Sequence, residues 1–261
     1  MEPKTISLAM PESQLTISDT CLKISFAEDH PSISTAIYGG GFRKVRHVLN
    51  QRLTHYWPSE KDFPGGSVEA YLKLCAQEEG ADVEKCSVLL TAAKVYLFSH
   101  KILRQGNLLV EAITTGGVEK TACRASSAPM YREEDGHFTP IGTINMMILL
   151  HGSLSPGIMA RALITLTEGK TAALQDLGIA DVNNGLPATG TGTDGITLVT
   201  EEQGIPYTDA GSFSELGSFL AQAAYTSVTE CLVKYDNPWN AFEELKTPKA
   251  VNIEIRDYNR K

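Results

Sequence analysis

The stretch "IGTINMMILLHGSLSPGIMARALITLTEGKTAALQDLG", residues 141–178, joins an apolar run directly to a long helical pattern. The apolar run, 144–150, is the strongest strand signal in the chain. After it, Ser155 suits a helix N-cap, Pro156 the first helical position and Gly178 the residue after the helix end. The stretch therefore predicts a strand followed by a long helix, which is the unit of α/β layered folds.

Strand and helix patterns alternate along much of the remaining chain. Apolar and polar residues alternate over 14–26 around a Ser-Asp-Thr turn, which predicts an N-terminal β-hairpin. Such a hairpin argues against an all-parallel sheet, so we expect an α/β fold with a mixed β-sheet flanked by long helices. Further strands are predicted over 86–93, 108–117 and 195–200. Helices are predicted over 65–80, 94–107 and 214–235, with another helix start after the glycines 39–41. A long loop is expected over 118–140 and a closing tail over 238–247.

Length and composition are those of an ordinary globular protein. The 261 residues are 42% hydrophobic and 21% charged, and no linker divides them, so we expect one domain over residues 1–261. The formal net charge of −8 implies an acidic surface, which repels phosphate backbones and argues against a nucleic-acid partner. Whether the chain forms a homo-oligomer is left open by the sequence.

Cysteine usage and the N-terminal sequence bear on the cellular compartment. The five cysteines include no Cys-x-x-Cys pair, which argues against a disulfide framework and against a structural zinc site. The N-terminal residues lack the apolar stretch of a signal peptide, and the longest apolar run is too short to cross a bilayer. We therefore expect a cytoplasmic protein without membrane insertion.

The segment "LPATGTGTDGITLVT", residues 186–200, combines glycines, threonines and one aspartate ahead of an apolar strand. Glycines let the backbone approach a ligand and turn its N–H groups toward it, and threonine hydroxyls both donate and accept hydrogen bonds. The pattern favours a ligand-binding loop, and the alternative is a flexible loop whose aspartate bonds its own backbone. The candidate residues are Thr189, Gly190, Thr191, Gly192, Thr193 and Asp194.

Polar residues in the predicted strands and helices add further candidates. Asn145 follows Thr143 in an otherwise apolar strand, and a buried amide needs hydrogen-bonding partners. Asn145 is therefore either a structural hydrogen-bonder or a substrate contact, and Asn50 is comparable. On the long helix, Arg161 and Glu168 share one face, which is either a solvated polar stripe or part of a site.

Several common catalytic motifs do not occur in the sequence. The Gly-Lys-Thr triplet at 169–171 is not a P-loop, because position 164 is isoleucine and the triplet lies inside the predicted helix. No Gly-x-Gly-x-x-Gly both follows a strand and opens a helix, and neither Gly-x-Ser-x-Gly nor His-Glu-x-x-His is present. Nucleotide-binding and serine-hydrolase functions are therefore not favoured, and no metal ligands are assigned.

Three blocks of the sequence resemble the adenosylcobinamide amidohydrolase family. They are "GTIN" (142–145), "LSPGIMARALITLTEGKTAALQDLGI" (154–179) and "GLPATGTGTDGI" (185–196), and the resemblance extends over roughly residues 34–235. Such enzymes cleave the amide that links aminopropanol to the corrin ring of adenosylcobinamide, giving adenosylcobyric acid, from which cobalamin (vitamin B12) synthesis resumes. The resemblance therefore implies a hydrolase of cobalamin salvage, with a corrinoid as its small-molecule substrate and no required cofactor.

This resemblance suggests roles for the polar candidates. Asp194 is expected to be a base or an orienting group, Thr191 or Thr193 the nucleophile, and Glu168 an alternative acid or base. The expected substrate contacts are Asn145, Thr143, Thr189, Gly190, Gly192, Asn50, His47 and Arg161. Two other functions stay open, a corrinoid-binding module without hydrolysis and an amidohydrolase acting on another small ligand, and so does dependence on a metal.

Overall fold

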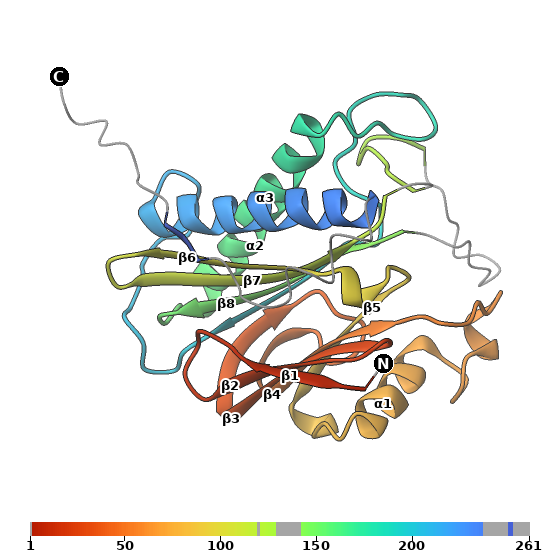
Figure 1. Ribbon diagram of the computed structural model, residues 1–261, viewed down its shortest axis with the longest axis horizontal. Helices are drawn as coiled ribbons and strands as arrows, with labels where there is room; N and C mark the ends of the chain where they lie inside the picture. The colour runs from red at the N-terminus through yellow and green to blue at the C-terminus, as the bar shows by residue number, and fades with distance from the viewer. Residues whose placement is uncertain (1, 119–120, 129–141, 237–249, 253–261) are drawn as a thin grey trace.

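The described part of the chain forms four layers: a helical layer, two layers of strands and a further helix (Figure 1). The computed structural model describes residues 2–118, 121–128, 142–236 and 250–252. Helices α2 (Pro156–Asp176) and α3 (Glu215–Asp236) pack on the first strand layer, and α1 (Val68–Glu78) packs on the second. The first layer contains β6 (Ser99–Gln105), β7 (Leu108–Gly116), β8 (Ile144–His151) and β9 (Gly195–Thr200). The second contains β1 (Lys4–Ser7), β2 (Ser13–Ile17), β3 (Cys21–Ser34), β4 (Gly41–Arg52) and β5 (Cys86–Thr91).

Both strand layers belong to one curled, mixed sheet, because the long strand β3 takes part in each. Within the described residues the sheet has ten strands. Eight follow the order β1-β2-β3-β9-β8-β7-β6-β10, where β10 is Ala250–Asn252. The other two branch from this order, since β4 pairs with β3 and β5 pairs with β4. The first part of β3 pairs with β2, whereas its end, 32–34, pairs with β9. A register shift between Ser25 and His30 interrupts its pairing with β4 and marks the irregularity where the strand changes partners.

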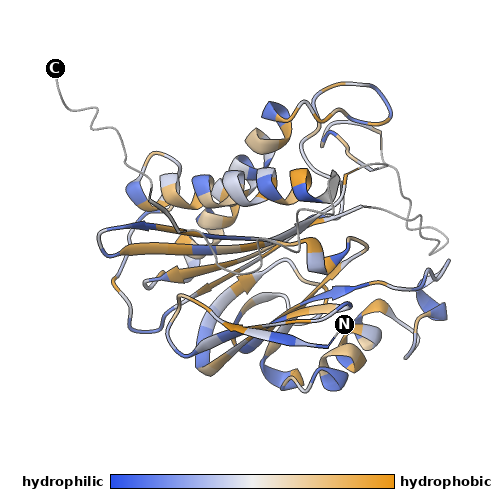
Figure 2. Ribbon diagram, viewed as in Figure 1, coloured by the Kyte–Doolittle hydropathy of each residue, from blue (hydrophilic) through white to orange (hydrophobic). Residues whose placement is uncertain are grey.

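Burial on both faces explains the apolar run of β8. Met146, Ile148 and Leu150 point into the core beneath α2 and α3, while Met147 and Leu149 point into the core between the two strand layers. A strand covered on both faces carries a continuous apolar sequence rather than an alternating one. Figure 2 shows that the strands of the first layer are largely hydrophobic, whereas the helices carry both hydrophobic and hydrophilic residues.

The structure confirms the expected mixed α/β fold and most of its elements. The hairpin forms as β2 and β3, and the deciding stretch forms β8 and α2, with Pro156 at the start of the helix and Gly178 just past its end at a φ of 67°. Ser155 occupies the N-cap position as expected, but its side chain makes no capping hydrogen bond. The predicted tail and most of the predicted loop over 118–140 lie outside the described residues.

The helix predicted over 94–107 is wrong. A short 3-10 turn, Val95–Leu97, leads into strand β6, which pairs antiparallel with β7. Gly106, at a φ of 55°, lies in the tight turn between the two strands, where a left-handed backbone is needed. Local periodicity favoured a helix here, but pairing with β7 decided for a strand.

The helix predicted after the triple glycine is also wrong, because the residues that follow form β4. This strand pairs antiparallel with β3 along one edge and parallel with β5 along the other. Val45, Val48 and Leu49 are fully buried between or beneath these layers. The partner strands lie far away in the sequence, so local patterns did not reveal them.

Candidate active site

A cavity of about 430 Å³ opens beside β5, between the ends of several strands. Its lining comes from the segments that follow β3 and β4, from the C-terminal end of β5 and from the N-terminal ends of β8 and β9. Strands β8 and β9 are parallel neighbours with Asn145 opposite Gly195, so their first residues lie at the same edge of the sheet. The "GTIN" block and the glycine-threonine loop therefore meet at this cavity.

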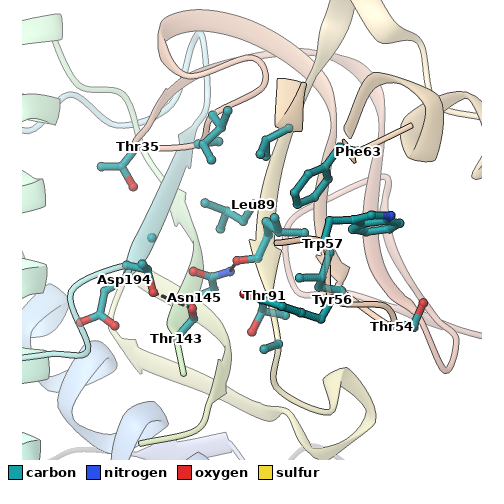
Figure 3. Close-up of a pocket in the computed structure, with 18 of the residues that line it drawn as sticks. Thr35, Thr54, Tyr56, Trp57, Phe63, Leu89, Thr91, Thr143, Asn145 and Asp194 are labelled. Carbon is teal, nitrogen blue, oxygen red and sulfur yellow. Dashed lines mark hydrogen bonds between the residues drawn. The ribbon is translucent and has the colours of Figure 1, made fainter. Parts of the chain in front are cut away.

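The cavity has two chemically different walls (Figure 3). One, here called the polar wall, consists of Thr143, Asn145, Thr193 and Asp194. The other, here called the apolar wall, consists of Ile37, Tyr56, Trp57 and Phe63. Hydroxyl, amide and carboxylate groups that can hydrogen-bond an amide thus face a hydrophobic and aromatic surface, as is usual in small-molecule sites.

Asp194 lies at the centre of a buried hydrogen-bond network. Its carboxylate forms an ion pair with the ammonium group of Lys170, and the two side chains are only 11% and 7% exposed. It also accepts the backbone N–H of Ile144 at 2.9 Å, and the hydroxyl and backbone N–H of Thr191 at 2.5 and 3.2 Å. One carboxylate therefore joins α2 to the starting residues of β8 and β9.

Lys170 is the site residue that the sequence analysis missed. It lies on α2 one turn from the buried residues Leu166 and Ala173, on the helix face that packs on the sheet. A lysine on the apolar face of a helix is a signal for a buried, paired charge, and it was available in the sequence. Gly190 makes room for the pair, since a Cβ at that position would lie 2.3 Å from Asp194 Oδ2.

Two threonine hydroxyls meet in the polar wall. Thr143 Oγ1 and Thr193 Oγ1 are 2.8 Å apart, and the Thr193 hydroxyl donates to the carbonyl of Gly142 at 3.0 Å. Because that donation uses the only hydrogen of the Thr193 hydroxyl, Thr143 is the donor between the two. Thr193 is exposed to the cavity, whereas Thr191 is 1% exposed and donates to Asp194. Of the two proposed nucleophiles, only Thr193 lines the cavity.

Asn145 and Asn50 form a second buried network behind the polar wall. The Asn145 amide donates to Asn50 Oδ1 and to the carbonyl of Leu90, each at 2.9 Å. The Asn50 amide in turn donates to Thr115 Oγ1 at 2.7 Å. The structure thus brings Asn145 to the cavity and places Asn50 one step behind it.

Besides Thr191 and Asn50, six predicted site residues lie outside the cavity lining: Glu168, Arg161, His47, Thr189, Gly190 and Gly192. Glu168 is exposed on α2, so the role of alternative acid or base is not supported by its position. Arg161 pairs with Asp209 at the surface, and His47 on β4 bonds Ser25. Thr189 accepts the backbone N–H of Ala125 and supports the loop rather than the cavity.

Asp181 holds the residues just before the glycine-threonine loop. Its carboxylate accepts hydrogen bonds from the Ser127 hydroxyl and from the backbone N–H groups of Asn183 and Arg124. These donors, the Ser127 hydroxyl first, lower the pKa of Asp181 to about 2. Further along, Gly192 turns the loop at a φ of 85°, a backbone conformation that favours glycine.

Within the described ranges, no three His, Cys, Asp or Glu side chains gather in a way that could hold a metal ion. Nor is any helix in that part of the chain long and apolar enough to cross a membrane.

Comparisons with known proteins agree with the sequence resemblance. The chain is 31% identical over 211 residues to an uncharacterized protein of Methanocaldococcus jannaschii, covering 75% of this chain and 80% of that protein. It is 24% identical over 211 residues to the adenosylcobinamide amidohydrolase of Methanosarcina mazei, covering 77% of this chain and 88% of that protein.

Two solved structures show more distant likeness. A protein of Pyrococcus horikoshii matches at a TM-score of 0.40 and 13% identity, covering 86% of this chain and 77% of that one. A beta-aminopeptidase of a Burkholderia species matches at a TM-score of 0.40 and 14% identity, covering 90% of this chain and 88% of that one. The sequence model of one family, described as adenosylcobinamide amidohydrolase, matches residues 8–238, and the chain therefore belongs to that family, which is named for the hydrolysis of an amide.

Proposed function

We propose that this protein hydrolyses the amide bond between aminopropanol and the corrin ring system of adenosylcobinamide, releasing adenosylcobyric acid for cobalamin salvage. The observation that carries this proposal is that two of the family-like sequence blocks line one cavity and the third reaches them through Lys170. The ion pair of Lys170 with Asp194, and the hydrogen bond from Ile144 N to Asp194, tie the three blocks together. The relative from Methanosarcina mazei, which bears the name of this activity, adds support.

The size and lining of the cavity fit one arm of such a substrate. A volume of about 430 Å³ is within the usual range for ligand pockets, but a corrin macrocycle with its adenosyl group is larger. In this proposal the aminopropanol arm enters the cavity and the macrocycle covers its mouth. Ile37 and Tyr56 are 60% and 46% exposed there and offer apolar surface to it.

We assign the role of nucleophile to Thr193. Its oxygen attacks the amide carbon, the bond from that carbon to nitrogen breaks, and the hydroxyl proton ends on the departing aminopropanol. Water then hydrolyses the resulting threonine ester, which gives the free carboxylic acid and restores the hydroxyl. Thr143 orients Thr193 through their hydrogen bond.

Asp194 is assigned an orienting role. Its oxygens already accept four hydrogen bonds, from Lys170, Ile144 and the two donor groups of Thr191, so they are poorly placed to take up a proton as well. The same bonds hold Thr193, its neighbour in the chain, at the cavity. This favours orientation over the role of base.

The test is incubation of the purified protein with adenosylcobinamide, followed by mass spectrometry of aminopropanol and adenosylcobyric acid. Release of both products, with and without a metal chelator, is the expected result and would also show that no added cofactor is needed. Tight binding without release would point to a corrinoid-binding module instead. Neither binding nor release would point to an amidohydrolase with another small substrate.

A further inference from the structure

The side-chain amide of Asn145 has one oxygen that no described residue bonds. Both of its N–H groups are used, toward Asn50 Oδ1 and the carbonyl of Leu90. A flipped amide would place its oxygen against these two acceptors, so the network sets which end is oxygen. Among the described residues, no hydrogen bond reaches Asn145 Oδ1, and this oxygen is not one of the fully enclosed polar atoms without a partner, so it stays accessible from the cavity.

The free oxygen lies in the wall of the cavity. Asn145 lines it beside Thr143 and Asp194 on one side and Leu89 and Thr91 on the other, as Figure 3 shows. Its Oδ1 faces Gly195, where an added Cβ would lie 2.7 Å from this oxygen.

The absence of a side chain at Gly195 keeps that space clear. A Cβ there would also lie 2.6 Å from Leu89 Cδ2. Glycine at the first residue of β9 therefore leaves the Asn145 oxygen open to a ligand.

An acceptor that no protein group bonds and that is accessible from a cavity is available to a donor of the ligand. The arrangement is also rigid, because Asn145 is held by Asn50 and Asn50 by Thr115, all nearly or fully buried. A fixed acceptor of this kind favours a ligand group that can donate, such as an amide N–H, and disfavours an atom that brings only lone pairs.

We propose that Asn145 Oδ1 accepts the N–H of the scissile secondary amide, and that this contact makes the site selective for an amide over the matching ester. The inference rests on the proposed function, since it concerns the bond cleaved there. It gives Asn145 the task of recognising the leaving-group nitrogen, while Thr193 on the neighbouring strand end faces the carbonyl carbon.

The experiment compares two substrates with two proteins. The substrates are adenosylcobinamide and its ester analogue, in which oxygen replaces the scissile amide nitrogen. The wild-type protein is expected to favour the amide relative to the intrinsic reactivities of the two bonds, measured as their rates of alkaline hydrolysis. In Asn145→Ala, the ester-to-amide ratio of kcat/KM should rise by about 10- to 100-fold. Asn107→Ala, which removes an exposed asparagine at the turn between β6 and β7, should leave the ratio unchanged.

The outcomes separate this inference from the proposed function. If the wild-type protein cleaves the amide but Asn145→Ala lowers both rates equally, the inference is overturned and the proposed function stands. If the wild-type protein cleaves neither compound, the inference and the proposed function are both overturned. Should Asn145→Ala fail to fold, the wild-type comparison still decides, because a preference for the ester as large as in alkaline solution would overturn the inference.

Discussion

The two walls of the cavity differ in how they are built. The polar wall stands at strand ends and is held by hydrogen bonds. Asp194 is bonded to Lys170 on α2, Asn145 is bonded to Asn50 on β4, and Thr143 and Thr193 are bonded to each other. The apolar wall stands on the segments that follow β3 and β4, and part of it is exposed. Groups that react with a bond must be held in place, whereas groups that cover a hydrophobic ring can adapt. The predictions below test this difference.

The largest expected effect is on the chemical step. Thr193→Ala should lower kcat for adenosylcobinamide by at least about 10³-fold, because it removes the hydroxyl that we propose attacks the amide. Thr193→Ser should keep measurable turnover. Thr167→Ala, which removes an exposed hydroxyl on α2 bonded to its own helix, is the matched control. Near-normal steady-state rates for a folded Thr193→Ala protein would remove Thr193 from the chemistry.

The next effect concerns the stability of the polar wall. Lys170→Met leaves the buried carboxylate of Asp194 without its cation, and we expect a loss of about 3–5 kcal/mol in the free energy of unfolding, measured with urea. The double variant Lys170→Met/Asp194→Asn should recover part of that loss. Lys44→Met, at an exposed ion pair with Glu202, should change it by no more than about 1 kcal/mol. An equally small change for Lys170→Met would show that the buried ion pair of the polar wall matters no more for stability than the exposed one.

The apolar wall should affect binding rather than chemistry. Ile37→Ser is expected to raise KM for adenosylcobinamide about 3- to 10-fold with kcat unchanged, because it removes apolar surface from the cavity mouth. Ile164→Ser is a matched control, since both isoleucines are 60% exposed but Ile164 lies on α2 outside the cavity. A fall in kcat for Ile37→Ser would mean that this wall also positions the reacting bond.

The smallest effect is a pH dependence at the base of the loop. Because the pKa of Asp181 is lowered from its ordinary value of 3.8 to about 2, its carboxylate stabilises the folded protein above pH 3.8, and this contribution is lost as the pH falls toward 2. Asp181→Asn should therefore be less stable than wild type at neutral pH and show a shallower loss of stability over that acid range. Urea unfolding at several pH values measures this, with the exposed Asp62→Asn as the control. Parallel pH profiles for Asp181→Asn and wild type would contradict the assignment.

Part of the site was open to sequence reasoning because it depends on short segments. The polar strand end with Thr143 and Asn145 and the loop ending at Asp194 each stand out locally, and the structure brings them to one cavity. Glu168, Arg161 and His47 stood out equally, but which face of a helix or strand meets the cavity depends on packing.

The sequence by itself determined the mixed α/β class, the strand and helix at 144–176, the glycine-threonine loop and the family, because these rest on periodicity, capping residues and contiguous motifs. Only the tertiary structure decided that β4 and β6 are strands, that Lys170 pairs with Asp194, and that Thr193 rather than Thr191 lines the cavity. Each of these depends on partners distant in the sequence, and hydrogen-bond pairing and charge burial between such partners exist only once the layers have packed.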